Sequence, residues 1–283
     1  MALPLNYIKT STDTWPNGKA KQLHKKFLNE HWKQVDSEEH KQLPDLHFKN
    51  RSILQTPDIT WDIRSVSHLL KRTTTGVNLE EIQTFINNGM EISIQGLLAS
   101  QELPSPPGTW VNEDLPDWDS LSSDERQEVI QAYFNRMRVF QKWWAQRIMN
   151  GGLNITETMT LFWHSYFASA YSKVFYPQAM YQQNNVFRAL CMGNFKDLLR
   201  QVTFGPAMMI WLDISGSRKE APNENFAREL MELFTLGVDN YSQSDVVAAS
   251  HAFTGYVTNG IETNYDFDTM EGWGYWWTDW HDF

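Results

Sequence analysis

Cysteine is almost absent from this sequence. One residue, Cys191, occurs in a chain of 283, which excludes an internal disulfide bond and any metal site built from several thiolates. Long apolar runs are missing too, because no segment approaches the roughly 18 to 20 apolar residues of a membrane-spanning helix. The N-terminal residues lack the apolar stretch of a signal peptide, so no export signal is visible in the sequence.

Positive charge is also scarce. The 24 Lys and Arg residues are outnumbered by 34 Asp and Glu, and the formal net charge is −10. This balance argues against a nucleic-acid surface and against attraction to an anionic membrane. The P-loop, GxGxxG, GxSxG and HExxH motifs are all missing, so nucleotide binding, the common serine hydrolases and zincin proteolysis lose support.

The hydrophobic pattern is that of a mostly α-helical protein with one core. Residues 1–60 are polar and interrupted by prolines, which predicts an N-terminal arm. Residues 61–260 predict a multi-helix core domain with little β structure, at most a short hairpin near 256–263 about Asn259 and Gly260. Residues 261–283 form a Trp-rich C-terminal segment, which we expect to be truncated.

Apolar periodicity and capping residues place the individual helices. One helix begins at Asp62 and ends before Gly76. Further helices are predicted over 79–88, 92–99, 123–149, 156–171, 177–190, 195–203, 207–214, 223–236 and 244–253. The helix at 156–171 is apolar nearly all round, which indicates a central buried helix that carries His164.

The most informative segment is NENFARELMELFTLG at 223–237, because it places charged side chains in a helix that otherwise has a core pattern. Asn223 is a candidate N-cap and Gly237 stands where a C-terminal glycine belongs. On a helical wheel Glu224, Arg228 and Glu232 form a polar ion ladder. Glu229 falls at the border of the apolar stripe and is expected to be half-buried or buried, so it needs a partner.

Six segments, in this order and spacing, resemble one family. They are HLLKRTTTG (68–76), ETMTLFWHSYFAS (157–169), QNNVFRALCMGNFKDLLR (183–200), PAMMIWLD (206–213), PNENFARELMELFTLG (222–237) and YSQSDVVAASHAFTGY (241–256). The chain resembles the bacterial domain of unknown function 1800 family over residues 61–283. That family is often exported and has no established activity. The resemblance suggests an extracytoplasmic location and a sulfatase-like protein partner.

Two departures from the family pattern stand out. Tyr166 replaces the second histidine that the family usually carries two residues after His164. The chain also stops at Phe283, where family members continue, so we expect it to be the N-terminal part of a longer protein or a shortened relative. A mechanism that needs both histidines, or the missing part, would be incomplete here.

A first functional hypothesis is a metal-assisted hydrolase or oxidoreductase in extracytoplasmic polymer handling, with a divalent metal such as Zn, Mn or non-haem Fe. The candidate ligands are His164, Glu229, Glu232, His281 and Asp282. In the structural alternative, Glu229 accepts from a backbone group or from an arginine such as Arg188 or Arg200. His164 then donates to a core carbonyl.

A second hypothesis pairs Glu229 or Glu232 with Asp245 as acid and base of a glycan-processing enzyme. The alternative for Asp245 is a capping box with Ser242.

A third hypothesis is a non-catalytic binding or scaffold module for a polysaccharide or a protein. Its Trp-rich tail, residues 271–283, would recognise the partner or drive self-association. The alternative is that the missing C-terminal part covers these aromatic side chains.

Overall fold

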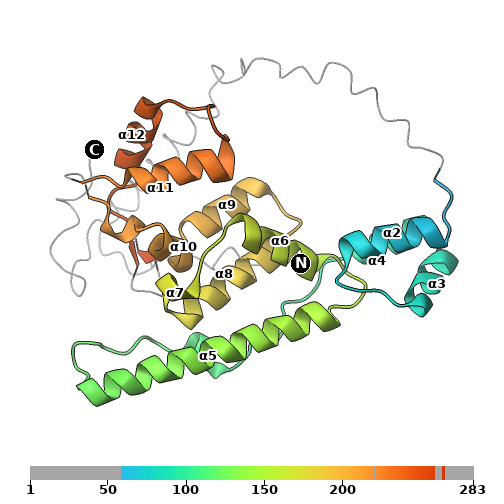
Figure 1. The fold of residues 1–283 in the computed structure, drawn as a ribbon, viewed down its shortest axis with the longest axis horizontal. Helices are drawn as coiled ribbons and strands as arrows, with labels where there is room; N and C mark the ends of the chain where they lie inside the picture. Colours follow the sequence, from blue (N-terminus) through green and yellow to red (C-terminus); the bar gives the residue numbers. More distant parts are fainter. Residues whose placement is uncertain (1–58, 219–220, 259–262, 265–283) are drawn as a thin grey trace, which may run out of the picture. The chain divides into compact units, whose positions relative to one another are not determined.

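The protein is mostly helical, as predicted (Figure 1). The computed structural model describes residues 59–218, 221–258 and 263–264. From Trp61 onward these residues belong to one compact unit. The predicted N-terminal arm and the Trp-rich segment, including the predicted self-association region 271–283, lie outside the described residues.

Short connections join most of the helices. They are α2 (Ile63–Thr73), α3 (Leu79–Asn88), α4 (Met90–Leu98), the 3-10 turn η3 (Thr109–Asn112), α5 (Ser123–Asn150), α6 (Thr156–Tyr166), α7 (Tyr171–Val174), α8 (Pro177–Leu190), α9 (Phe195–Thr203), α10 (Pro206–Trp211), the 3-10 turn η4 (Ile214–Gly216), α11 (Glu224–Glu229), the π-helix η5 (Leu230–Thr235) and α12 (Gln243–Ala252). Longer loops over 99–108 and 113–122 flank η3. No helix of the described part is long and apolar enough to cross a membrane.

Local capping explains where several helices begin and end. The Ser122 side chain accepts from the Glu125 N–H and the Glu125 carboxylate accepts from the Ser122 N–H, which closes the predicted capping box of α5. Gly89 follows α3 with φ 79°, a conformation that favours glycine. The capping bonds of α5 join residues a few positions apart, so the sequence alone predicts them.

The central buried helix is α8 and not α6. Most of the 14 residues of α8 are buried, and the helix packs against α5, α6, α7, α9 and α10. On α6 the buried residues are Glu157 and Thr160, whereas Leu161 and Phe162 are 41% and 51% exposed. The prediction of a central helix over 156–171 was therefore wrong. Polar side chains on α8 hid its central position, and α6 already ends at Tyr166.

Two aromatic-rich clusters of apolar side chains include residues of α8, one from its N-terminal half and one from its C-terminal half. Phe187 packs in a cluster with Phe167, Phe226 and Phe234, which includes side chains from α9, α10 and η5. Tyr181 belongs to a second cluster, which is built on α5, η3 and α7. Helices α2, α3 and α4 form a third cluster of their own.

The predicted β structure is confined to one short pair within the described residues. Strand β1 (Val257–Thr258) pairs antiparallel with β2 (Thr263–Asn264), and Thr258 lies opposite Thr263. The predicted start of the second strand at Ile261 lies outside the described residues. The predicted turn residues Asn259 and Gly260 lie outside the described residues.

Candidate functional site

The acidic segment forms two kinds of helix in place of the single α-helix predicted over 223–236. Asn223 caps α11 as expected, because its side chain accepts from the Phe226 N–H at 3.1 Å. The chain then widens into the π-helix η5, and the Thr235 hydroxyl donates to the Leu230 carbonyl at 2.7 Å. A π-helix turns less per residue than an α-helix, so Leu233, which the wheel placed on the apolar stripe, is 55% exposed.

Arg228 of the predicted ion ladder is bound mainly by α12. Its guanidinium lies 3.7 Å from Glu224, and it donates to the Gln243 side chain at 2.8 Å. Gln243 in turn donates to Glu224 at 2.9 Å. Glu232 accepts from the Tyr241 hydroxyl, and this hydrogen bond raises the pKa of Tyr241. Because the Arg228 and Glu224 side chains are 39% and 47% exposed, the network is solvated.

The other predicted carboxylates, Glu229 and Asp245, do not belong to a metal-binding group of the described residues. Glu229 is half-buried, within the expected range. Asp245 closes the capping box of α12, and its hydrogen bonds to Ser242 hold its pKa below the usual range. His281 and Asp282 lie outside the described residues. Within residues 59–218, 221–258 and 263–264, no three His, Cys, Asp or Glu side chains come together in an arrangement that could hold a metal ion.

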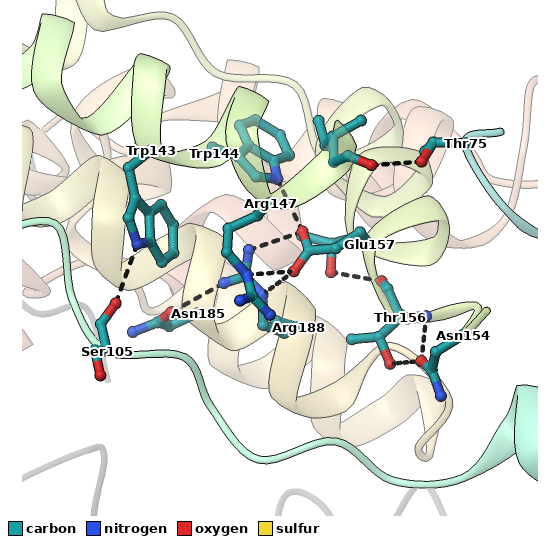
Figure 2. A network of polar contacts seen from close by, with 12 residues as sticks. Thr75, Ser105, Trp143, Trp144, Arg147, Asn154, Thr156, Glu157, Asn185 and Arg188 are labelled. Atoms are coloured by element: carbon teal, nitrogen blue, oxygen red, sulfur yellow. Dashed lines mark hydrogen bonds and ion pairs between the residues drawn. The ribbon is translucent and has the colours of Figure 1, made fainter. Parts of the chain in front are cut away.

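Among the described residues, a buried ion pair joins α6 to α8 (Figure 2). Arg188 donates from Nε to Glu157 Oε1 at 2.7 Å and from Nη2 to Oε2 at 3.0 Å. The two side chains are only 2% and 6% exposed. Such a bidentate pair compensates for the loss of water around both charges.

Further groups complete this pair. Trp144 donates its indole N–H to Glu157 at 3.2 Å, and Arg188 also donates to Asn185 at 3.1 Å. The Arg188 guanidinium lies 5.2 Å from the ring centre of Trp143. Both oxygens of the Glu157 carboxylate therefore accept hydrogen bonds. The side chain has a structural role, because it links α6 to α8 and to α5.

Sequence reasoning missed this pair, because it assigned Arg188 to Glu229 as one alternative. A signal was present: Glu157 opens the apolar segment of α6, and Arg188 stands directly after Phe187. A charged residue at each of two apolar positions calls for a partner. The distance of 31 residues between them gave no indication that they pair.

His164 lies on α6, half-buried between aromatic rings. Its ring contacts Trp144 edge to face at a centroid distance of 5.0 Å and Phe187 at 6.2 Å. Burial lowers the pKa of His164, so the imidazole is neutral near pH 7. Among the residues that the structure describes, its side chain makes no hydrogen bond, so the expected bond to a core carbonyl is not seen there.

A second polar group lies where α5, α7 and α8 meet, and we call it the tyrosine–glutamine cluster. It consists of Trp118, Tyr133, Tyr171 and Gln178. Within the described ranges the indole N–H, both hydroxyls and both carboxamide atoms are buried and have no hydrogen-bond partner. Gln178 is 0% exposed and Tyr133 is 1% exposed. The Gln178 carboxamide faces the Tyr133 hydroxyl without completing a hydrogen bond of normal geometry.

Aromatic rings surround the tyrosine–glutamine cluster. Tyr133 contacts Phe175 and Tyr176 at centroid distances of 5.7 and 6.1 Å, and Trp118 at 6.3 Å. Burial raises the pKa of Tyr133 to about 12, helped by the nearby Tyr176. Burial also raises the pKa of Tyr171 to about 12. The hydroxyls are therefore un-ionised donors and acceptors at neutral pH.

Phe175 adds backbone strain at the same place. Its φ is 64°, in the left-handed region that a bulky side chain rarely adopts. Strained residues of this kind concentrate at functional sites, where the surrounding structure holds them in place. Sequence reasoning did not single out the cluster, because tyrosine and glutamine at helical core positions carry no motif.

Comparisons with known proteins identify the family. Residues 68–282 match the model of a family described as protein of unknown function (DUF1800), and the chain belongs to this family. This confirms the resemblance seen in the sequence. No curated protein and no solved structure matches the chain significantly. The family description names no activity, so a function has to be argued from the residues themselves.

Proposed function

For this member of the unknown-function family, we propose a non-catalytic binding role, in which the tyrosine–glutamine cluster takes a small polar molecule or the terminal unit of a polymer. One observation carries the proposal. The Gln178 carboxamide and the Tyr133 hydroxyl face each other in a buried position, and among the described residues neither completes a hydrogen bond of normal geometry with a protein group.

Unpaired buried groups are costly. Each buried donor or acceptor without a partner costs about 1 to 3 kcal/mol. Several such groups at one place reduce the stability of the fold by an amount that is large compared with total protein stability. A ligand that forms hydrogen bonds with these groups would recover this free energy. Binding sites often reduce the stability of the unliganded protein in this way. The strained Phe175 beside them supports the same reading.

The charged groups favour binding over acid-base or metal chemistry. Glu157 is committed to Arg188, and Asp245 to its capping box. His164 contacts aromatic rings, and no described carboxylate joins it in a group of three ligands. A metal site on His164 would need ligands such as His281 and Asp282 from outside the described residues.

A nuclear magnetic resonance titration tests the binding role. The carboxamide signals of Gln178 are assigned by their loss in Gln178→Leu and followed with glycerol, acetamide, glucose, glucosamine and glucuronate as probes. At least one probe should shift them at saturable concentration. The exposed carboxamide of Gln243, which is already bound to Glu224, should not move. If no probe shifts Gln178, the proposal fails.

Two further measurements bear on the same proposal. Tyr133→Phe removes an unpaired hydroxyl and should stabilise the fold by ~1 kcal/mol. Tyr166→Phe, the matched control, removes a hydroxyl that donates to the Phe234 carbonyl at 3.2 Å and should not stabilise. A loss of stability in Tyr133→Phe would contradict the argument. Stoichiometric metal in the purified protein that is lost in His164→Gln would contradict the non-catalytic role.

A further inference from the structure

We propose that the exposed face of α5 is an interface for a second copy of this chain, whose own α5 lies antiparallel along it. This inference goes beyond the proposed binding role and does not depend on it. It is drawn from the order of the charges along α5, from their exposure and from the counter-charges that the described part of the chain does not supply.

One side of α5 is buried and the opposite side is exposed. Met137 and Phe140 share an apolar cluster with Tyr181 of α8, and α5 also packs against α6. Six exposed polar residues follow the opposite side, within about 40° of one line along the helix when each residue advances by about 100°. We call them the outer face of α5: Asp124, Glu128, Gln131, Asn135, Arg138 and Lys142.

The charges on the outer face change sign along the helix. Asp124 and Glu128 lie in its N-terminal part, and Arg138 and Lys142 follow in its C-terminal part. Asp124 and Lys142 stand nine positions to either side of Tyr133. Glu128 and Arg138 stand five positions to either side of it. The outer face is therefore complementary in charge to its own reverse.

This order favours a second copy that runs in the opposite direction. In a two-fold dimer residue i contacts residue j of the partner, and residue j contacts residue i. Antiparallel helices centred on Tyr133 would place Asp124 opposite Lys142 of the second copy. At the centre Gln131 would meet Asn135 of the second copy, and carboxamides both donate and accept hydrogen bonds. A parallel copy would instead bring like charges together.

Within one chain the same charges lack compensation. Asp124 and Glu128 are four residues apart, as are Arg138 and Lys142, and like charges at this spacing destabilise a helix. In the part of the chain that the structure describes, none of these four side chains forms an ion pair. A second antiparallel copy would supply all four counter-charges at once.

The contact is small, so the dimer is of the weak, concentration-dependent kind. The segment from Asp124 to Lys142 is about 27 Å long at a rise of about 1.5 Å per residue. Exposed ion pairs contribute little each, and small interfaces belong to transient complexes. Two chains of net charge −10 also repel each other overall. The test must therefore separate the local order of charges from the net charge.

Two charge-reversed variants of the full chain make this separation. The acid-face variant carries Arg138→Glu and Lys142→Glu, and the base-face variant carries Asp124→Lys and Glu128→Lys. Sedimentation equilibrium should show a monomer–dimer equilibrium for the wild type. Each variant alone should dimerise at least about tenfold more weakly. An equimolar mixture should dimerise within about threefold of the wild type, because the mixed pair restores every opposite charge and keeps the total charge of two wild-type chains.

A matched control changes the net charge as much as the acid-face variant does, but at exposed positions of α2 and α9. This control, Lys71→Glu with Lys196→Glu, should dimerise at least about tenfold more tightly than the acid-face variant. Circular dichroism verifies that each variant is folded. The single reversals Glu128→Lys and Arg138→Glu, alone and mixed, repeat the test away from the helix start, where a lysine opposes the helix dipole.

Three results would overturn the proposal. The first is a wild-type chain that stays monomeric at concentrations up to about 1 mM, where even a weak specific contact is populated. The second is a mixture of the two variants that associates no better than either variant alone. The third is equal association of the wild type and both variants, which would place the contact on another surface, such as residues 271–283.

Discussion

Removing Arg188 should destabilise the protein more than any other single change on the α6–α8 interface. The substitution Arg188→Met keeps the length of the side chain but removes two charge-assisted hydrogen bonds, of 2.7 and 3.0 Å, to Glu157. Glu157 then stays 6% exposed with one hydrogen bond, from Trp144 at 3.2 Å. An uncompensated buried charge of this kind costs about 3 to 5 kcal/mol.

A double-mutant cycle separates the charge from the packing. Denaturant unfolding is measured for Arg188→Met, Glu157→Leu and the double variant. Replacing both charges with apolar side chains leaves neither unpaired, so the double variant should be more stable than Arg188→Met. Arg147, whose Nε lies 3.9 Å from Glu157 and whose side chain is 41% exposed, offers only weak compensation.

Two results would refute this reasoning. One is a loss below about 1 kcal/mol for Arg188→Met, which is the size expected of a solvated pair. The other is a double variant whose loss equals the sum of the two single losses, because independent sites add.

Three further expectations follow from exposure and pKa. Arg228→Ala breaks only a solvated contact with Glu224 and should cost less than about 1 kcal/mol in thermal unfolding; a loss of about 3 kcal/mol would mean that the pair is desolvated. Burial lowers the pKa of His164 from 6.5, so its contribution to stability is present above pH 6.5 and decreases as the pH falls below that value. In His164→Gln this part of the pH dependence should vanish, and an unchanged slope would contradict the burial of the imidazole. Burial raises the pKa of Tyr133 and of Tyr171 from 10.0 to about 12, so stability present below pH 10 is lost as the pH rises from 10 towards 12. Spectroscopic titration of the tyrosines should show one fewer late-ionising group in Tyr133→Phe than in the wild type.

Short-range features of this protein follow from its sequence. The span of α8, Pro177–Leu190, and that of α9, Phe195–Thr203, agree with the prediction to the residue. The capping boxes at Ser122 and Ser242 also form as predicted. Helix periodicity and caps depend on residues within a few positions of one another, so the sequence carries this information locally. The family could be identified for a similar reason, because it is defined by such segments in a fixed order.

Only the tertiary structure decided which side chains are paired and which are not. Glu157 meets Arg188 across 31 residues, and Tyr133 meets Gln178 through the packing of two helices. A helical wheel drawn at a fixed 100° per residue also cannot predict the π-helix η5, in which Leu233 is exposed. Burial and pairing are properties of neighbours in space. The candidate site therefore consists of residues that stand out in the sequence neither by type nor by spacing, and that become notable because the fold leaves their polar atoms buried and unpaired.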